Sequence, residues 1–414
     1  MKRPIAISLS PNTKTNDVFL AFRLIFSPWT YINGNYPKVL EQWFRNYFKV
    51  SNAISFASGR GALLAILKTL GIGLQDEVII QAFTCVAVCD PIIKTGAKPI
   101  FADINNSLTM DAEDLEKKIT AKTKAIIVQH TFGIPSDLNK ILAIAKNHGI
   151  AVIEDCAHII GGKYKDKRLG TFGDASFFSF GRDKAFSSVF GGMAITDNEL
   201  LGKKIRIFCK QQKNPSYFWV AQQLFHPIAF YFILPIYNFF AFGKFLLIFF
   251  QKLKLLSLPV SSKEKQGGLS LKFARKLPNA FACLAIFQLK KINEYNQKRE
   301  AVADYYLKNI KNKEFIFPYQ KSIPFLRFPI LADKRDEIIN FFKRKGIYLG
   351  KWYSETVGPK GVSFKSIYYR QGLCPNAELI AKKIINLPTY PVMEPNEEKK
   401  IVNLLENYVK DSRN

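Results

Sequence analysis

The chain has 414 residues, of which 48% are hydrophobic, and its formal net charge is +27. This length suits two domains, or one large domain with a smaller one, and the hydrophobic content excludes a disordered chain. The six cysteines form neither a paired framework nor a C-x-x-C site, so we expect a reducing, cytoplasmic compartment and no metal centre.

The basic charge is spread along the chain rather than collected in a tail, and no recognised nucleic-acid-binding motif accompanies it. We therefore expect no nucleic-acid partner. Two explanations of the charge stay open: a generally low acid content, and a specific anionic surface as partner.

Helical and strand-like segments alternate through the first half of the chain, after an amphipathic helix predicted over 36–48. Short apolar strands separated by helices indicate parallel β-α-β units, hence an α/β fold with a mostly parallel sheet flanked by helices. The predicted helices are 62–70, 87–95 and 137–148, and the predicted strands are 77–81, 99–102, 125–129, 151–154, 176–180 and 192–196.

An apolar insert over 215–263 breaks this alternation. There is no aspartate or glutamate from 200 to 263, and 215–243 carries no charged residue, while lysines lie on both sides. A spanning helix needs about 20 mostly apolar residues, and here Pro227 and Pro235 interrupt the run. The pattern favours contact with an anionic membrane surface through residues 215–250 over a span. A hydrophobic subunit interface or core is the alternative.

The last part of the chain, 264–414, predicts a small C-terminal α/β domain. It follows a large domain over 1–214 and the insert over 215–263. The predicted elements of the small domain are helices 279–295, 297–310, 335–345 and 397–410 and a strand over 325–331.

One lysine, Lys184, stands in a setting that indicates chemistry. It follows a strand-like run and precedes Gly191 and Gly192, and upstream of it Asp155 ends a buried-looking strand. Pyridoxal 5'-phosphate requires an amine to bond its aldehyde and an anion to keep its pyridine nitrogen protonated. A carboxylate at the end of a parallel strand lies where α/β sheets place ligands. The plain alternatives are a surface-loop lysine and a helix N-cap aspartate.

Ser58, Gly59 and Arg60 immediately precede an alanine- and leucine-rich helix. Backbone N–H groups at a helix start bind phosphate without any special side chain. Arg60 would either make a bidentate phosphate contact or point elsewhere. A simple helix cap is the alternative for the whole motif.

Two parts of the chain, about 55–196 and 385–392, resemble the DegT/DnrJ/EryC1/StrS family of sugar aminotransferases, which are fold-type I enzymes dependent on pyridoxal phosphate. The resemblance rests on short stretches that occur in the family's order. They are 58–63, 76–80, 96–104, 122–127, 154–158, 170–174, 179–184 and 386–391.

The resemblance implies a role for each candidate site residue. Lys184 would hold the cofactor covalently and move the proton, and Asp155 would pair with the ring nitrogen. Ser179 resembles the family hydroxyl that binds the phosphate, together with the motif at Ser58. His158 stands where the family most often has glutamine, near the ring oxygen, and either side chain can donate a hydrogen bond there. A plain strand-end serine and a structural histidine are the alternatives.

The chain departs from the family at two places. The family has a ring-covering aromatic residue at the position of Cys85, so Phe83 is the candidate for that role here. The family's motif that gives an asparagine to the neighbouring subunit's phosphate site corresponds to 274–277, where no asparagine occurs. These departures affect the expected substrate more than the expected cofactor chemistry.

As a function, the resemblance implies an aminotransferase that moves an amino group from an amino acid, with glutamate the expected donor, to a nucleotide-linked keto-sugar. The implied setting is cell-surface polysaccharide or amino-sugar biosynthesis by a cytoplasmic homodimer, with peripheral contact at the inner face of the membrane as a further expectation. One alternative is a sugar dehydratase, but such relatives typically replace the lysine with histidine. The other is a catalytically altered membrane-surface binding or assembly protein.

Overall fold

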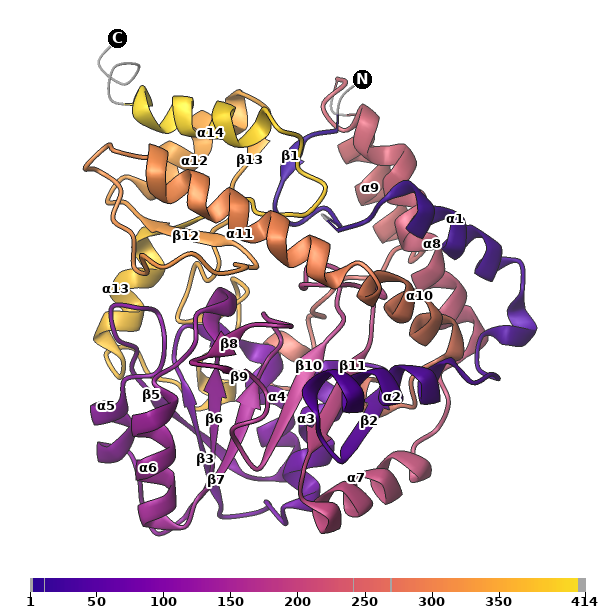
Figure 1. Ribbon diagram of the computed structural model, residues 1–414, viewed down its shortest axis with the longest axis vertical. Helices are drawn as coiled ribbons and strands as arrows, with labels where there is room; N and C mark the ends of the chain where they lie inside the picture. The colour runs from indigo at the N-terminus through magenta and orange to yellow at the C-terminus, as the bar shows by residue number, and fades with distance from the viewer. Residues whose placement is uncertain (1–2, 11, 241, 269, 409–414) are drawn as a thin grey trace.

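The structure is a computed structural model that describes residues 3–10, 12–240, 242–268 and 270–408. Its centre is a seven-stranded sheet in the order β2-β11-β10-β7-β6-β3-β5 (Figure 1). Neighbouring strands pair in parallel except β11, which is antiparallel to both β10 and β2. The strands are β2 (Asn52–Phe56), β3 (Glu77–Gln81), β5 (Lys98–Ala102), β6 (Thr123–Gln129), β7 (Ala151–Asp155), β10 (Ala175–Ser179) and β11 (Gly192–Thr196).

The sheet lies between two layers of helices, as its apolar strands require. In β3, Val78 and Ile80 belong to the core cluster that contains the apolar face of α3 (Gly59–Thr69). Ile79, between them, belongs to the cluster that contains α2 (Tyr36–Phe48) and α6 (Leu138–His148). Because successive strand residues point to opposite faces, a strand buried on both sides reads as an unbroken apolar run. The predicted α/β class with a mostly parallel sheet is confirmed.

The remaining helices and strands complete the two layers and the C-terminal part. The longer helices are α1 (Thr15–Ile25), α4 (Val86–Thr95), α5 (Ala112–Lys117), α7 (Glu199–Gln211), α8 (Tyr217–Ile233), α9 (Phe242–Lys252), α10 (Asn279–Leu289), α11 (Ile292–Asn309), α12 (Arg335–Arg344), α13 (Pro375–Lys383) and α14 (Glu397–Glu406). The small strands are β1 (Ile5–Ala6) with β13 (Ile347–Tyr348), β4 (Thr84–Cys85) with β14 (Val357–Gly358), β8 (Lys163–Tyr164) with β9 (Lys167–Arg168), and β12 (Phe328–Leu331) with β15 (Ile384–Leu387).

Several predicted boundaries differ from the structure. The helix predicted over 279–295 is wrong at its end, because α10 stops at Leu289 and α11 begins at Ile292, so the chain turns at Lys290 and Lys291. Strand β2 and helix α1 escaped prediction. The last predicted helix ends at Glu406, and Lys410 lies outside the described residues.

The apolar insert folds as a pair of helices, α8 and α9, joined through the short turn η3 (Leu234–Ile236). The prediction that Pro227 interrupts the apolar run is wrong, because α8 continues through Pro227, which is buried. Pro235 lies in η3, where the α-helix has ended. Helix α8 packs along α1, and the two lie side by side in Figure 1. By length and composition the stretch Tyr217–Ile236 would suffice to cross a membrane, but 56% of its apolar window is buried inside the protein.

Candidate active site

A cavity of about 560 Å³ opens at the carboxyl ends of the central strands. Gln129 ends β6, Asp155 ends β7 and Ser179 ends β10, and all three line it. Ser58, two residues after β2, joins them. Parallel strands bring their carboxyl ends to one edge, which is where open α/β sheets bind ligands.

One end of the cavity is built to hold an anion. Ser58 caps α3: its side-chain oxygen accepts a hydrogen bond from the Gly61 amide at 3.0 Å and its hydroxyl donates to the Phe273 carbonyl at 2.9 Å. The first amides of a helix have no partner within the helix, and Gly59 and Arg60, at the start of α3, line the cavity. A helix start of this kind binds phosphate through its N–H groups and its dipole.

Close approach of three segments creates this end of the cavity. A β-carbon added at Gly192 would lie 2.4 Å from the Gly59 amide nitrogen, so no side chain fits there. A β-carbon on Gly59 would meet the Ser179 β-carbon at 3.0 Å. Ser58, Gly59 and Ser179, predicted to bind the cofactor phosphate, are thus brought together.

Lys184 lines the same cavity, in a turn held from two directions. The Asn12 side-chain amide donates to the Lys184 carbonyl. Arg299 of α11, which is buried, donates to the Ala185 carbonyl at 2.6 Å and to the Asn12 side-chain oxygen at 3.0 Å. Asn12 and Arg299 therefore fix the backbone on which the lysine stands.

Burial lowers the pKa of Lys184, against the opposing influence of Cys85 and Asp155. A lowered pKa increases the fraction of neutral amine, which is the nucleophilic form. Lys184 therefore has the environment expected of a reactive lysine rather than of a surface-loop lysine.

Asp155 is buried at the end of β7, with its carboxylate at the cavity. Its Oδ1 accepts a hydrogen bond from the Ala157 amide at 2.9 Å. Burial raises the pKa of Asp155, while the Ala157 hydrogen bond and the charge of Lys184 act against that rise. A carboxylate in this position is prepared to meet a cationic ring nitrogen, because such a partner would offset its burial.

His158 lies in the cavity wall, with both ring nitrogens engaged. Nδ1 accepts a hydrogen bond from the Phe132 amide at 3.2 Å, so the proton of the neutral ring is on Nε2, which donates to the Tyr353 hydroxyl oxygen at 3.2 Å. Burial, with Lys184 and Arg327, lowers the pKa of His158 well below its usual value. The hydroxyl proton of Tyr353 is consequently the donor left for a group in the cavity.

Phe83, expected to cover the cofactor ring, does not line the cavity. It is fully buried, and its ring meets that of Tyr353 edge-on at 5.4 Å. Cys85 lines the cavity, as do Trp352 and Tyr353. The aromatic side chains that line the cavity are thus Phe177 and Phe190 together with Trp352 and Tyr353, and not the predicted Phe83.

The side chain of Arg60 turns away from the helix start. Its guanidinium pairs with Glu264 and lies 3.7 Å from the centroid of the Phe273 ring. Glu264 is the first acid after the insert, and it also accepts from the Ser261 amide at 2.8 Å. Arg60 therefore anchors the returning end of the insert, and only its backbone amide is directed by α3 toward an anion.

Trp352, Tyr353, Arg182 and Arg327 belong to the neighbourhood of the site but were not predicted. The Arg327 guanidinium lies over the Trp352 ring, 3.4 Å from its centroid, and 4.0 Å from the Asp183 carboxylate. The pairing of β14 with β4 carries the segment that follows Trp352 and Tyr353 to the cavity. Arg182 lies in the 179–184 stretch, whereas no local motif in the sequence marks Arg327, Trp352 or Tyr353, since these reach the site only through tertiary packing.

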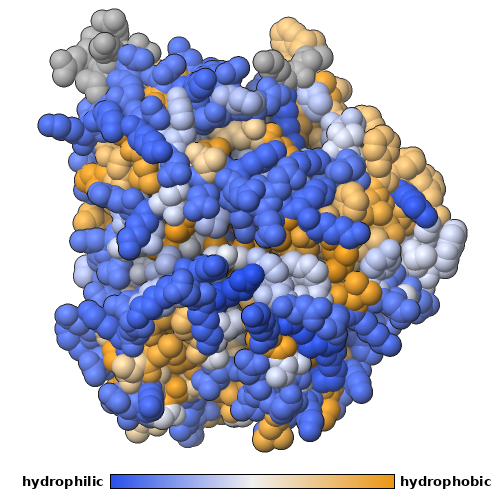
Figure 2. All heavy atoms as spheres, viewed as in Figure 1, coloured by the Kyte–Doolittle hydropathy of each residue, from blue (hydrophilic) through white to orange (hydrophobic). Residues whose placement is uncertain are grey.

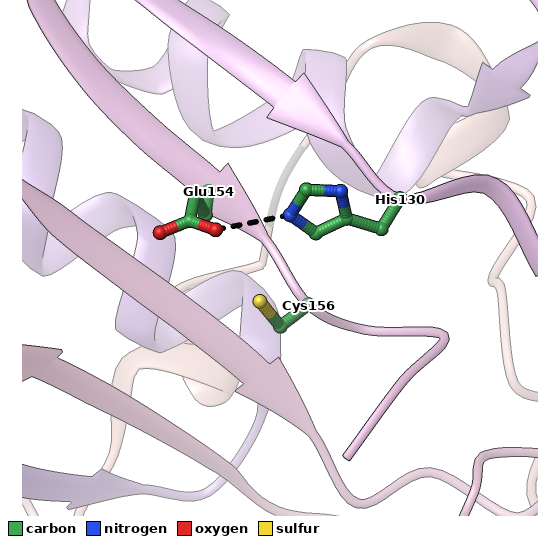
Figure 3. Close-up of side chains that lie close together, drawn as sticks. All are labelled: His130, Glu154 and Cys156. Atoms are coloured by element: carbon green, nitrogen blue, oxygen red, sulfur yellow. Dashed lines mark hydrogen bonds and ion pairs between the residues drawn. The ribbon is translucent and has the colours of Figure 1, made fainter. Parts of the chain in front are cut away.

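His130, Glu154 and Cys156 form a buried cluster beside the site with the donor types of a metal centre (Figure 3). Glu154 is already saturated, however. Its carboxylate accepts from His130 Nε2 at 3.0 Å and from the amides of Gly170, Phe172 and Gly173 at 2.8, 2.6 and 3.0 Å. Burial raises the pKa of the Cys156 thiol well above its usual value, which opposes the thiolate a metal requires. We assign the cluster a structural role: it ties the 170–173 loop to β7.

Replacing Glu154 with glutamine is expected to lower the free energy of unfolding by about 2–3 kcal/mol, because an NH₂ group then faces backbone donors that lose their acceptor. Urea denaturation of the variant measures the loss, with Glu113→Gln, at an exposed acid of α5, as the unaffected control. If zinc instead raised the stability of the parent protein and left the stability of Glu154→Gln unchanged, the cluster would be a metal site.

The same variant should show a defined pH dependence. Burial disfavours the Glu154 charge, but the hydrogen bonds from His130, Gly170 and Gly173 prevail and lower its pKa. The folded pKa is thus below the unfolded one, so the stabilisation is present above the unfolded pKa and is lost as pH falls through the folded pKa. The difference between parent and variant should shrink on acidification.

Comparison with known proteins agrees with the family resemblance and with the arrangement of the cavity. The sequence profile of the DegT/DnrJ/EryC1/StrS aminotransferase family matches residues 15–226 and 249–406. The unmatched residues between the two matches, 227–248, fall within the apolar insert. The family resemblance drawn from short motifs is therefore confirmed across most of the chain.

Individual relatives cover nearly the whole length. The chain is 30% identical over 377 residues to a pleiotropic regulatory protein of Geobacillus stearothermophilus, covering 90% of this chain and 89% of that protein. It is also 30% identical over 379 residues to GDP-perosamine synthase of Escherichia coli O157:H7, covering 90% and 89%. The fold matches a putative sugar aminotransferase of Streptococcus pneumoniae in its PLP form, with a TM-score of 0.75, 20% identity and 99% coverage of both chains.

Proposed function

Because the chain belongs to the DegT/DnrJ/EryC1/StrS aminotransferase family, we propose that it transfers the amino group of glutamate to the keto group of a nucleotide-linked sugar. It is an aminotransferase, and its cofactor is pyridoxal 5'-phosphate. The observation that carries the proposal is the meeting of Lys184, Asp155 and the start of α3 in one cavity. The relative named GDP-perosamine synthase supports the sugar substrate.

The residues present fit the cofactor. The start of α3 with Ser58, Gly59 and Ser179 would receive its phosphate, and Asp155 its ring nitrogen. When bound, pyridoxal phosphate supplies an aldehyde and an electron-withdrawing ring.

The chain's own part in catalysis is to hold, orient and move protons. Asp155 keeps a proton on the ring nitrogen by its charge. Lys184 supplies the amine for covalent attachment and, when released, carries the proton away from the amino acid's α-carbon. Asn12 and Arg299 hold the backbone of Lys184 in place through hydrogen bonds to the carbonyls of Lys184 and Ala185.

The two alternative functions are not favoured. A dehydratase of this family would typically carry histidine in place of Lys184. A protein that had lost turnover has no reason to keep Lys184, Asp155 and Ser179 around one cavity.

For its setting we propose a cytoplasmic homodimer that touches an anionic membrane surface through residues 215–250. The homodimer follows from the family resemblance. The membrane contact is supported by the lack of acids from 200 to 263 and by the outward-facing aromatic residues of α8 and α9. A subunit interface over the same residues is the competing assignment.

A spectral titration tests the enzymatic proposal. The purified protein should absorb in the visible through its bound cofactor, and addition of glutamate should convert that band to the shorter-wavelength band of the aminated cofactor. A nucleotide-linked keto-sugar should then restore the visible band. A protein that binds the cofactor but responds to no amino acid would contradict the proposal.

A further inference from the structure

Helix α1 presents two apolar faces, one of which is turned to solvent. Val18, Ala21 and Leu24 are buried toward the core. Phe19 and Phe22, with Phe26 just after the helix, are 69%, 52% and 65% exposed, and the Phe22 and Phe26 rings meet edge-on at 4.9 Å. Their spacing of three and four residues places them in one stripe. Folding buries only the inner face of the helix, so the exposed outer stripe is available to a binding partner.

The exposed aromatic side chains of the insert continue this stripe. Helix α1 packs along α8, and Figure 2 shows apolar side chains gathered on the side of the molecule where Figure 1 places α8 and α9. Further exposed members of this surface, which we call the aromatic face, are Trp29, Phe218, Phe232, Phe239, Phe240, Phe242, Phe245, Ile248, Phe249 and Leu253. A contiguous apolar area of this kind on a single chain marks an interaction site.

The exposed charges on α1 and the insert are of one sign. Lys244, Lys252 and Lys254 of the insert are exposed, as is Arg23 on α1. The one acid of α1, Asp17, is buried and paired with Lys291 at 3.0 Å. From 200 to 263 the sequence holds no acid at all. The aromatic face is therefore bordered by cations that no acid of α1 or the insert neutralises.

This combination separates a bilayer from a protein partner. Lysine is depleted in protein interfaces, whereas aromatic residues bordered by lysine and arginine are typical of helices that lie in the headgroup region of an anionic membrane. Basic residues near such a surface are attracted to its negative potential. Charge complementarity thus favours a lipid surface over a second copy of this basic chain.

We propose that α1 and the insert form a single docking surface for an anionic lipid bilayer, with Phe19, Phe22 and Trp29 entering it beside Phe240 and Phe245. The proposal rests on the membrane contact proposed above for residues 215–250 and adds α1 to it. The helix pair of the insert and α1 lie flat on the bilayer, because both halves of the aromatic face then reach the headgroup boundary together.

Sedimentation of the full-length protein with lipid vesicles tests this surface. The protein should pellet with vesicles of mixed phosphatidylglycerol and phosphatidylcholine, pellet less with phosphatidylcholine alone, and be only partly released by high salt. Two double variants separate the halves: Phe19→Ser with Phe22→Ser, and Phe240→Ser with Phe245→Ser. Each should lower the partition coefficient at least about tenfold, since each removes two apolar side chains from the bilayer. Leu74→Ser with Leu379→Ser, at exposed positions outside the aromatic face, is the matched control.

A charge variant protects the test against misfolding. Arg23→Glu leaves the apolar side chains in place and should weaken binding to the anionic vesicles while leaving the residual binding to neutral vesicles. The visible cofactor band and the response to glutamate, measured on every variant, report on the catalytic domain independently of docking.

Each outcome decides one part. If the Phe19 and Phe22 variant and the Arg23 variant both bind like the parent while the insert variant does not, the share of α1 is overturned and the contact through 215–250 stands. If the parent binds no vesicles, docking is overturned, and self-association of the parent that both double variants abolish would identify a second copy as the occupant. The spectral response to glutamate persists in either case, so neither failure touches the aminotransferase.

Discussion

Replacing Lys184 with alanine should lower the rate of amino transfer by about 10⁴-fold or more, because the chain then lacks both its nucleophile and its proton carrier. Among the residues that line the cavity, Lys265, Lys351 and Lys360 also carry amines. They do not lie in the turn at Lys184 that Asn12 and Arg299 hold in place. The visible absorbance of the bound cofactor should also disappear. Transfer from glutamate to the keto-sugar, followed by product formation, measures the rate.

Two companion variants define the role of Lys184. Lys184→Arg keeps a positive charge but offers no neutral amine near pH 7, so it should be as inactive as the alanine variant. Lys146→Ala, on the exposed face of α6, should behave as the parent. Because Ser58, Gly59 and Ser179 are unchanged, Lys184→Ala should still take up the cofactor through its phosphate. Substantial turnover by Lys184→Ala would refute the assignment.

The sequence predicts the core of this site because local patterns and topology coincide there. Asp155 and Ser179 each end a recognisable apolar strand, and Ser58 precedes a recognisable helix. Once these strands are parallel, their carboxyl ends must share one edge. The relative position of Asp155 and Ser179 thus follows from secondary structure alone, whereas Ser58 reaches the same edge on β2, a strand that was not predicted.

The outer wall of the site depends on contacts that no local pattern encodes. Trp352 and Tyr353 reach the cavity because β14 pairs with β4, two strands of two residues each. The place of Phe83 near Cys85 predicts a ring partner, but its backbone has a positive φ of 60° and its side chain is buried against Tyr353. Short pairings and single unusual dihedral angles give no periodic signal.

Arg60 shows the same limit at one residue. In the sequence Arg60 lies two residues after Ser58, which is predicted to bind the cofactor phosphate, and a guanidinium there suits a phosphate. In the structure Arg60 pairs with Glu264, which is more than two hundred residues away in sequence. Burial lowers the pKa of Arg60 to about 10. Glu264, directly after the insert, thus decides the direction of the Arg60 side chain, and the same ion pair holds the returning end of the insert at this corner of the site.

Asp155→Asn should slow amino transfer by raising its activation free energy by about 3–5 kcal/mol. This is the cost expected when one partner of a buried charge pair is removed. A neutral amide fits the space and can still accept the Ala157 hydrogen bond, so folding and cofactor uptake should persist. What is lost is the negative charge that keeps the ring nitrogen protonated. Single-turnover rates with glutamate measure the loss without interference from substrate release.

The conservative variant separates charge from shape. Asp155→Glu keeps the carboxylate and displaces it by one methylene, so it should retain more activity than the asparagine variant. Burial raises the pKa of Asp155 in the protein without cofactor, and a cationic ring beside the carboxylate would oppose that rise. Cofactor affinity should accordingly fall on acidification in the parent, as Asp155 takes up a proton, and stay flatter in Asp155→Asn. Near-parental rates in Asp155→Asn, with an unchanged pH profile of cofactor binding, would place the anion that serves the ring elsewhere in the cavity.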